Sequence, residues 1–330
     1  MRIGLIGAGR IGAMHARLLD AQPDVAEVVV ADVDPARAVV VAETLTRGVA
    51  AGIETAMDGV DAVAIASSTD THVEYLIAAA KAGLPTFCEK PIALDLENTR
   101  RAIDAIDDAG VSVLMGFQRR YDPAIRAIRD RVVASGSRVP YLVRSQTHDP
   151  EPPPIDYVKV SGGIFRDCLI HDIDAVRYVT GQEVVSVRAI GAATGFPEIA
   201  AAGDVDSAAA LLEMSGGTLA QLSGIRHDPV GYDVRLEVFT PDAAMSAGWG
   251  DAAAIVSLEP GAVAPADPFT NFWDRFDAAY KAEIAAFVAM VGGKATPAAT
   301  HHDAYADLQV AAACDLSLSE GRTVYMSEVS

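Results

Sequence analysis

The sequence RIGLIGAGRIG at residues 2–12 decides the fold of the N-terminal part of this chain. Residues 3–6 form an apolar run typical of a buried strand, and the run leads directly into the pattern G-x-G-x-x-G. Gly7 permits a tight turn, Gly9 lets the backbone approach a pyrophosphate, and Gly12 lets the following helix lie close to the strand. The first turn of that helix offers unpaired N–H groups to phosphate. The stretch therefore predicts a dinucleotide-binding unit, with a role in packing alone as the alternative for its glycines.

Asp32 follows Gly12 by twenty residues and ends the second predicted strand. A carboxylate at this place accepts hydrogen bonds from the adenosine ribose hydroxyls and repels a 2′-phosphate, so it favours NAD over NADP. Arg37 is the counter-candidate for a 2′-phosphate contact, and its other interpretation is a solvated residue in the first turn of a helix. For the loop after the third predicted strand, contact with the cofactor and loop capping are both open. The predicted cofactor-binding residues are Gly7, Gly9, Arg10, Ile11, Gly12, Asp32, Ser67, Thr69, Glu89 and Lys90.

Short apolar runs alternate with amphipathic stretches through the first third of the chain. Strand and helix in strict alternation predict a parallel sheet with helices on both faces, a Rossmann domain over residues 1–120. Asp70 is expected to cap one helix, and Gly83 and Gly110 are expected to follow two others. The predicted strands are 2–6, 28–31, 62–66, 86–88 and 111–115, and the predicted helices begin at Arg10, Pro35, Thr71 and Leu94.

The rhythm changes after residue 120. Several strand-like runs follow one another between residues 184 and 257, and Ser215-Gly216-Gly217 joins two of them as a hairpin. The chain closes with two predicted helices, 275–291 and 302–320. Residues 121–330 are therefore predicted to form an α+β domain with a large, mostly antiparallel sheet, which makes the whole chain an α/β protein of two domains.

Composition and charge exclude several classes of partner. A formal net charge of −19 repels nucleic-acid phosphates and anionic lipids. No apolar run approaches the about 20 residues that a membrane helix needs, and the N-terminal segment does not resemble a signal peptide. The three cysteines are widely separated, which indicates neither disulfides nor a zinc site, and the histidines lack metal-ligand spacing. We expect a cytoplasmic protein without a catalytic metal.

Lys90 is the first candidate for chemistry. It follows Glu89 at the end of the fourth predicted strand, and ligands of open parallel sheets bind beyond the carboxyl ends of the strands. Pro91 restricts the backbone of the preceding residue and favours an extended conformation for Lys90. A solvated surface lysine is the alternative.

Asp167 and His171 are the second candidate constellation, in a predicted helix that begins at the glycine pair 162–163. Residues four apart share one helical face. A carboxylate beside an imidazole raises the basicity of the imidazole and orients it, as a general base for an alcohol proton requires. A structural capped pair is the alternative.

These motifs, in this order, resemble the Gfo/Idh/MocA family of sugar and polyol oxidoreductases over the whole chain. The likeness rests on the sequences GAGRIG at 7–12, EKP at 89–91 and the Asp167-x-x-x-His171-Asp172 helix. GFQRRYD at 116–122 and GYD at 231–233 look most like the inositol 2-dehydrogenases of that family. The resemblance implies a Rossmann domain, then an α/β domain whose exposed sheet face builds dimers or tetramers.

The resemblance also implies roles. Lys90 would hold the reacting hydroxyl, His171 would take its proton, and Asp167 would orient His171 or the substrate. Departures from the family concern the ring hydroxyls, because Gln118 stands where methionine is usual, Asp149 where asparagine is usual and Thr147 where histidine is usual. The predicted substrate-binding residues are Lys90, Gln118, Arg119, Asp149, Asp167, His171 and Tyr232.

The predicted reaction is oxidation of a secondary hydroxyl of a cyclic polyol or sugar by hydride transfer to NAD. Two alternatives stay open at this point. One is a dehydrogenase for another sugar or carbonyl compound, since pockets for hydroxyl groups discriminate by single donors and acceptors. The other is a nicotinamide-binding regulator without turnover.

Overall fold

The computed structural model of the chain describes residues 1–136 and 139–329. It divides into two compact units, of which the first holds Met1–Gln118 and Ala279–Tyr305 and the second holds Arg119–Ala278 and the chain from Ala306 onward. The expected single boundary near residue 120 therefore needs a correction, because residues 279–305 belong to the first unit. Periodicity predicts a helix here but cannot say which core the helix covers.

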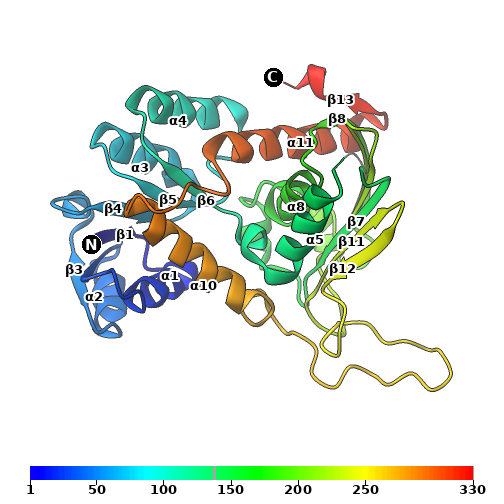
Figure 1. Cartoon of the computed structure of the whole chain (residues 1–330), viewed down its shortest axis with the longest axis horizontal. Coiled ribbons are helices and arrows are strands. Elements are labelled where there is room, and N and C mark those ends of the chain that lie inside the picture. The colour runs from blue at the N-terminus through cyan, green and yellow to red at the C-terminus, as the bar shows by residue number, and fades with distance from the viewer. Residues whose placement is uncertain (137–138, 330) are drawn as a thin grey trace. The chain divides into compact units, whose positions relative to one another are not determined.

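The first unit is built on a six-stranded sheet in the order β3-β2-β1-β4-β5-β6 (Figure 1). All neighbouring strands are parallel, as expected. Helices α1 and α2 lie on one face, and α3 and α4 lie on the other (Figure 1). The strands are β1 Arg2–Ile6, β2 Glu27–Ala31, β3 Gly48–Ala51, β4 Ala62–Ile65, β5 Thr86–Glu89 and β6 Val113–Gly116. The helices are α1 Arg10–Asp20, α2 Pro35–Glu43, α3 Thr69–Lys81 and α4 Leu96–Ala109.

Two local predictions for this unit are wrong. Strand β3 was not predicted, because a four-residue edge strand with half of its residues exposed has no apolar pattern to reveal it. Helix α3 begins at Thr69 with Ser68 at the N-cap position, so Asp70 lies in the first turn instead of capping it. Gly83 and Gly110 do follow their helices with positive φ angles, as predicted.

The second unit is built on a seven-stranded sheet in the order β12-β11-β7-β10-β9-β8-β13. It is mixed, because β7 and β10 pair in parallel while the other neighbours are antiparallel. The predicted hairpin is present as β9 and β10. The strands are β7 Leu142–His148, β8 Val184–Ala192, β9 Ser207–Met214, β10 Leu219–Ile225, β11 Asp233–Thr240, β12 Ala243–Ala247 and β13 Val324–Tyr325. The helices are α5 Pro123–Ala134, α6 Ile155–Val158, α7 Ile164–Asp167, α8 Ile170–Thr180 and α9 Pro197–Ala201.

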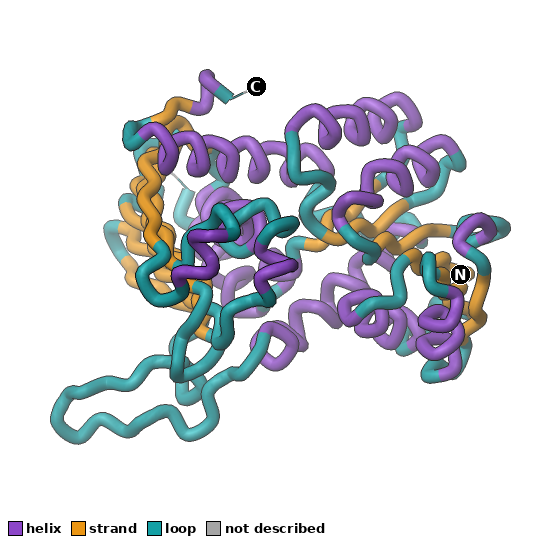
Figure 2. The backbone as a smooth tube through the Cα atoms, turned by 180° about the vertical axis from the view of Figure 1, so that it is seen from behind, coloured by secondary structure: helices purple, strands orange, loops and turns teal. Residues whose placement is uncertain are grey.

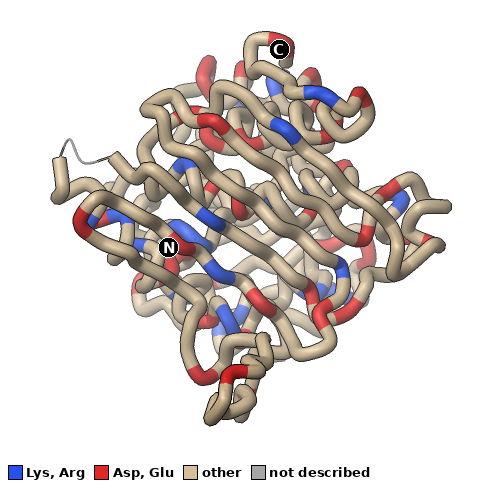
Figure 3. Tube along the Cα trace, turned by 90° about the vertical axis from the view of Figure 1, so that its right-hand side faces the viewer, with Lys and Arg blue, Asp and Glu red and all other residues tan. Residues whose placement is uncertain are grey.

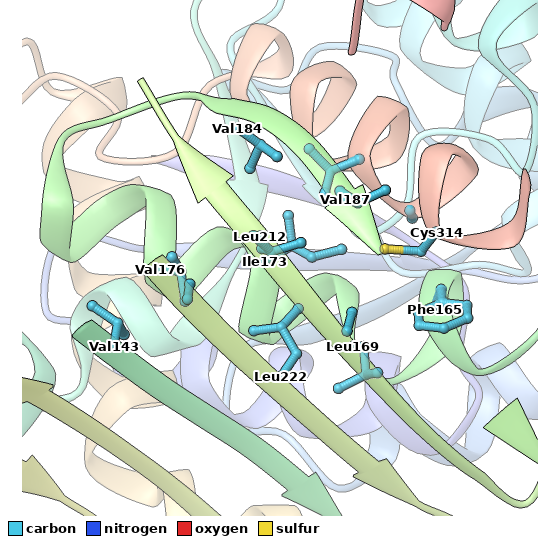
Figure 4. Close-up of a cluster of buried hydrophobic side chains, with 14 of the residues drawn as sticks. Val143, Phe165, Leu169, Ile173, Val176, Val184, Val187, Leu212, Leu222 and Cys314 are labelled. Atoms are coloured by element: carbon cyan, nitrogen blue, oxygen red, sulfur yellow. The ribbon is translucent and has the colours of Figure 1, made fainter. Parts of the chain in front are cut away.

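The core of the second unit lies between this sheet and its helices. Figure 4 shows Ile173 of α8 and Leu212 and Leu222 of the sheet in one apolar cluster, which Cys314 completes. Cys314 comes from α11 (His301–Glu320), and the chain enters that helix after α10 (Phe272–Val291). Both helices run from one unit into the other, so the chain connects the two units three times.

Among the residues that the structure describes, no helix lies on the opposite face of this sheet (Figure 3). Ile190, Leu211 and Leu219 are exposed among the sheet residues. Residues 248–271 form a long loop without helix or strand beyond β12 (Figure 2). No helix among residues 1–136 and 139–329 combines the length and the apolar character that crossing a bilayer requires.

The predicted helix around Asp167 and His171 is interrupted. Helix α7 ends at Asp167 and α8 begins at Ile170. The Leu169 N–H donates to the Ile164 carbonyl at 2.9 Å, five residues back instead of four. This wider turn shifts the two residues away from the regular spacing of one α-helical face. The expectation of a single helix was wrong, because backbone hydrogen bonding at a break leaves no trace in residue spacing.

Buried ion pairs tie α8 to the rest of the second unit. Arg120 donates to Asp174 at 2.6 Å, and Arg177 donates to Asp307 of α11 at 2.7 Å. Both aspartates are fully buried. Burial raises the pKa of Asp307 well above its ordinary value, and the charge of Asp174 raises it further while Arg177 opposes the shift.

We expect Asp307→Asn to flatten the pH dependence of stability. The unfolded chain releases the Asp307 proton near its ordinary pKa of about 3.9, whereas the folded chain releases it at a higher pH. Wild-type stability must therefore fall as the pH rises from the unfolded pKa through the folded one. The variant has no such proton, so its free energy of unfolding should fall less between about pH 4 and pH 8. Urea unfolding measures this, with the exposed Asp130→Asn as control, and equal slopes in all three proteins would contradict the prediction.

Candidate active site

The three glycines of the loop after β1 differ in their surroundings, because two are closely packed and one faces open space. Gly7 has a φ of +104°, which favours glycine. A Cβ on Gly12 would lie 1.9 Å from the Gly7 carbonyl oxygen, so helix α1 can approach the loop only without a side chain. Gly9 differs, because its φ is −71° and an added Cβ would meet nothing within 4 Å. Packing therefore explains Gly7 and Gly12 but not Gly9.

Asp32 holds this loop through backbone hydrogen bonds. Its Oδ2 accepts from the Ala8 N–H at 2.7 Å, and its Oδ1 accepts from the Asp34 N–H at 2.8 Å. Arg37 lies 4.0 Å from Asp32 Oδ1 and 3.3 Å from Asp34 Oδ2. The carboxylate thus orients the loop and retains lone pairs for ribose hydroxyls.

The N-terminus of α1, which contains Arg10 and Ile11, receives no hydrogen bond from an N-cap side chain. Its backbone donors, together with the open space at Gly9, fit the pyrophosphate of a dinucleotide. The residues present in the first unit therefore suit a nicotinamide dinucleotide.

The loop after β4 is bonded internally. The Ser67 and Thr71 hydroxyl oxygens are 2.7 Å apart, and His72 bonds both the Ser67 and the Pro91 carbonyls, at 3.1 and 2.9 Å. His72 thereby joins the Ser67 loop to the segment after Lys90. Thr69 opens helix α3. The hydroxyl of Ser67 is thus engaged with a side chain of the same loop and helix start, and the N-cap residue Ser68 makes no side-chain capping bond.

Lys90 follows the last residue of β5 and is half-buried. The peptide bond from Lys90 to Pro91 is cis. Glu89 accepts the Lys90 backbone N–H at 3.2 Å and is hydrogen bonded to His15 at 2.7 Å. Burial would raise the pKa of Glu89, but the hydrogen bond and charge of His15 and the charge of Lys90 outweigh burial and lower it. Glu89 is thus a fixed anion at the base of Lys90.

Asp167 ends α7 and is held on both carboxylate oxygens. Oδ1 accepts from the Tyr157 hydroxyl at 2.8 Å, and Oδ2 accepts from Arg226 Nη1 at 2.6 Å. Burial and the Asp167 charge raise the pKa of Tyr157, so the phenol stays a donor. The Asp167 carboxylate is therefore oriented by groups that lie on α6 and beyond β10.

His171 lies in the first turn of α8 and is half-buried. The next residue, Asp172, is fully buried and accepts from Ser145 at 2.5 Å, Thr147 at 2.6 Å and Arg119 at 3.0 Å. Asp172 thus anchors the start of α8 on β7. The backbone that carries His171 is fixed by its neighbour in the sequence.

The remaining predicted substrate-binding residues are Gln118, Arg119, Asp149 and Tyr232. Arg119 is buried and donates to Asp172 and, at 2.5 Å, to Thr147. Asp149 Oδ2 accepts from the Cys168 thiol at 3.2 Å. Tyr232 is buried, which raises the pKa of its phenol. The charge of Arg119 lowers this pKa, and the charge of Asp149 raises it. Gln118 is buried and is the last residue of the N-terminal segment of the first unit.

Three residues around Asp167 were not predicted from the sequence. Tyr157 lies in α6, whereas Asp204 and Arg226 lie outside helices and strands, and none of the three follows a motif. The sequence feature that could have revealed Arg226 is its place directly after the apolar strand β10. Charged residues at strand ends are usually solvated, so this feature did not indicate a buried arginine.

Two groups of potential metal ligands occur in the part of the chain that the structure describes. They are Asp107 with His301 and His302, and His148 with Asp228 and Asp233. Both groups join residues that are distant in the sequence, so ligand spacing could not reveal them. The absence of a catalytic metal stays a prediction.

Two family models match the chain as far as residue 245, and known proteins match nearly all of it. The model of the Gfo/Idh/MocA oxidoreductase family, NAD-binding Rossmann fold, matches residues 1–117, and the model of the C-terminal domain of that family matches residues 131–245. A myo-inositol dehydrogenase of Streptomyces leeuwenhoekii is 41% identical over 97% of this chain and 98% of its own length.

Solved structures of inositol dehydrogenases are also similar to this chain. A myo-inositol dehydrogenase from Corynebacterium glutamicum is 37% identical with a TM-score of 0.89 and covers 98% of both chains. A scyllo-inositol dehydrogenase from Lactobacillus casei, solved with NAD(H) and scyllo-inositol, is 28% identical over 99% of this chain and 99% of its own, with a TM-score of 0.88.

Alanine at Gly9 and at Gly12 should separate cofactor binding from packing. Gly12→Ala places a Cβ against backbone, so we expect it to lower the free energy of unfolding by about 1–3 kcal/mol or more. Gly9→Ala has open space and an ordinary φ, so its stability should stay within about 1 kcal/mol of the wild type. The added methyl group should nevertheless weaken NAD binding at least about tenfold, or 1.4 kcal/mol. Urea unfolding and calorimetric titration with NAD measure both effects, and unchanged NAD affinity in Gly9→Ala would contradict the assignment.

Proposed function

The chain belongs to the Gfo/Idh/MocA oxidoreductase family, and from this premise we propose that it oxidises a secondary hydroxyl of an inositol-class polyol with NAD. The observation that carries the proposal is the match of 41% identity to a myo-inositol dehydrogenase over 97% of the chain. The glycine loop held by Asp32 supports the same cofactor. In this proposal the first unit binds NAD, and the second binds the substrate and mediates assembly.

NAD, when bound, accepts the hydride from the carbon that carries the hydroxyl. The proposal assigns its pyrophosphate to the α1 N-terminus beside Gly9, with Arg10 and Ile11 in the first turn. Asp32 receives the ribose hydroxyls and disfavours a 2′-phosphate. Ser67, Thr69 and Glu89 complete the proposed contacts of the cofactor.

The proposal assigns Lys90, Asp167 and His171 to one reaction. His171 accepts the hydroxyl proton at an imidazole nitrogen as the C–H bond breaks and the C=O bond forms. The Lys90 ammonium binds the reacting oxygen and stabilises the negative charge that develops on it. Asp167 supplies a fixed negative charge that stabilises the imidazolium, and its two hydrogen-bonded oxygens support this role.

Gln118, Arg119, Asp149 and Tyr232 are proposed to recognise the other ring hydroxyls. Arg119 already donates to Asp172 and Thr147, so its proposed contribution includes shaping the pocket wall. Asp149 is an acceptor that is itself fixed by Cys168. The proposal covers the inositol class and does not choose an isomer, since the similar proteins include enzymes for both myo- and scyllo-inositol.

We further propose that the uncovered face of the seven-stranded sheet binds a second copy of the chain. Exposed apolar residues on this face, among them Leu211 and Leu219, support a dimer or tetramer. The cytoplasm is the proposed compartment, and the free state of all three cysteines supports it.

Substitution of the proposed acid–base residues should abolish turnover. The wild type should form NADH, detected by its absorbance, with at least one member of a panel of myo-, scyllo- and chiro-inositol and common aldoses. Lys90→Ala and His171→Ala should each lose at least about a hundredfold in kcat, because general-base and charge-stabilising groups contribute on that scale. Both variants should retain NAD binding by calorimetry.

Lys81→Ala and His302→Ala serve as controls, because both side chains are exposed and lie outside the proposed site. They should keep wild-type rates. Wild-type rates in Lys90→Ala and His171→Ala would refute the assignment of the site. No NADH formation with any panel member, or an equal or higher affinity for NADP, would refute the proposed reaction or the proposed cofactor.

A further inference from the structure

Arg226 is a buried cation with no role in the proposed chemistry. It directly follows β10 and is 1% exposed. Its Nη1 donates to Asp167 Oδ2 at 2.6 Å and to Cys168 Sγ at 3.2 Å, and its Nη2 donates to Asp204 Oδ2 at 2.9 Å. A planar guanidinium can bind two carboxylates and a sulfur atom at fixed angles, whereas an ammonium cannot. Its burial keeps it from touching a substrate.

Asp204 connects the same guanidinium to the start of α7. Its Oδ1 accepts from the Ile164 N–H at 3.1 Å. A Cβ on Gly163 would approach this oxygen to 3.2 Å, so the glycine leaves room for the contact. Arg226 therefore holds the last residue of α7 directly and its first residue through Asp204.

A second branch leads to the other candidate carboxylate. The Cys168 sulfur accepts from Arg226 and its thiol donates to Asp149 Oδ2 at 3.2 Å. Burial raises the pKa of Cys168 well above its ordinary value, and the charge of Asp149 raises it further. The thiol therefore remains a donor. One cation thus orders both Asp167 and Asp149.

We propose that Arg226 is a positioning residue that fixes the direction of the Asp167 carboxylate toward His171 and the substrate. This inference rests on the proposed function, because it acts through the proposed catalytic residue Asp167. The reason is geometric, since a charge-assisted hydrogen bond of 2.6 Å from a planar guanidinium holds the carboxylate oxygen in one direction. Tyr157 completes the geometry by donating to the other oxygen.

Other charged groups lie around the ion pair of Arg226 and Asp167. Asp204, Asp149 and Asp315 are further acids of this region, and Arg166 is engaged with Asp315 at 2.5 Å. Burial raises the pKa of Asp315 to about 6, and Arg166 opposes that shift. Tyr157 donates to Asp167, and the charge of Asp167 acts on Cys168.

The pH profile of kcat/KM tests the proposal in the full-length protein. Arg226→Met keeps much of the side-chain volume and removes the charge. It should lower kcat much more than it changes KM, and it should move the acid limb of the profile upward by about one pH unit or more. Arg226→Lys keeps a charge, so its acid limb should lie near that of the wild type.

Arg177→Met is the matched control, since Arg177 is also buried and also holds two acids, Asp307 and Glu183. It should lower stability without moving the acid limb. A double-mutant cycle adds a readout that needs no turnover. Asp167→Asn removes the negative charge that Arg226 faces, so it should raise the urea midpoint of Arg226→Met, whereas in the wild-type background it should lower the midpoint.

Three results would overturn the inference while the wild type is active. They are an unmoved acid limb in Arg226→Met, an equal shift in Arg177→Met, and additive effects of Arg226→Met and Asp167→Asn on stability. If the wild type oxidises no polyol, the proposed function fails instead. The stability cycle then still decides whether Arg226 and Asp167 are coupled, and additivity there would overturn the positioning role by itself.

Discussion

Compensation of buried arginine charges by aspartates is the constraint on which the second unit depends. Arg119, Arg120, Arg177 and Arg226 are all buried, and each donates to at least one aspartate. An unpaired charge in such a place is strongly destabilising, whereas a paired and hydrogen-bonded charge is tolerated. The pairs join α8 to β7, α11 and the segment that opens the unit, so apolar packing and charge pairing specify one arrangement together.

The candidate chemistry is placed by the same pairs. Asp172 fixes the backbone beside His171, and Arg226 fixes the carboxylate of Asp167. In the first unit the corresponding constraint is backbone contact, because the Gly7 carbonyl leaves no room for a Cβ at Gly12. Asp32 then holds the loop through the Ala8 N–H. A site built in this way needs few mobile side chains, which is a general requirement for precise positioning.

Several features of the site were open to prediction from the sequence because their signals are local. The glycine loop, Asp32 at the end of its strand, and Lys90 after β5 all follow from strand periodicity and fixed spacings. The partners of Asp167 were not open to prediction. Arg226 and Tyr157 lie about sixty and ten residues away along the chain, and a buried arginine without a motif looks like a solvated one. The break between α7 and α8 was also hidden, since irregular backbone hydrogen bonds such as that from Leu169 to Ile164 leave no pattern in the sequence.

The sequence by itself determined a parallel Rossmann sheet with a dinucleotide loop, a second domain rich in antiparallel strands, and the residue types of an alcohol dehydrogenase. These properties depend on contacts between residues that are near in the chain. Such contacts are visible in the sequence as a periodicity of 2 or 3.6 residues and as glycines where the backbone conformation requires them. Only the tertiary structure decided that residues 279–305 return to the first unit and that β7 pairs in parallel with β10. It alone also decided that Arg226 neutralises Asp167. Each of these depends on which distant surfaces bury one another, and burial is a property of the folded chain that local patterns do not encode.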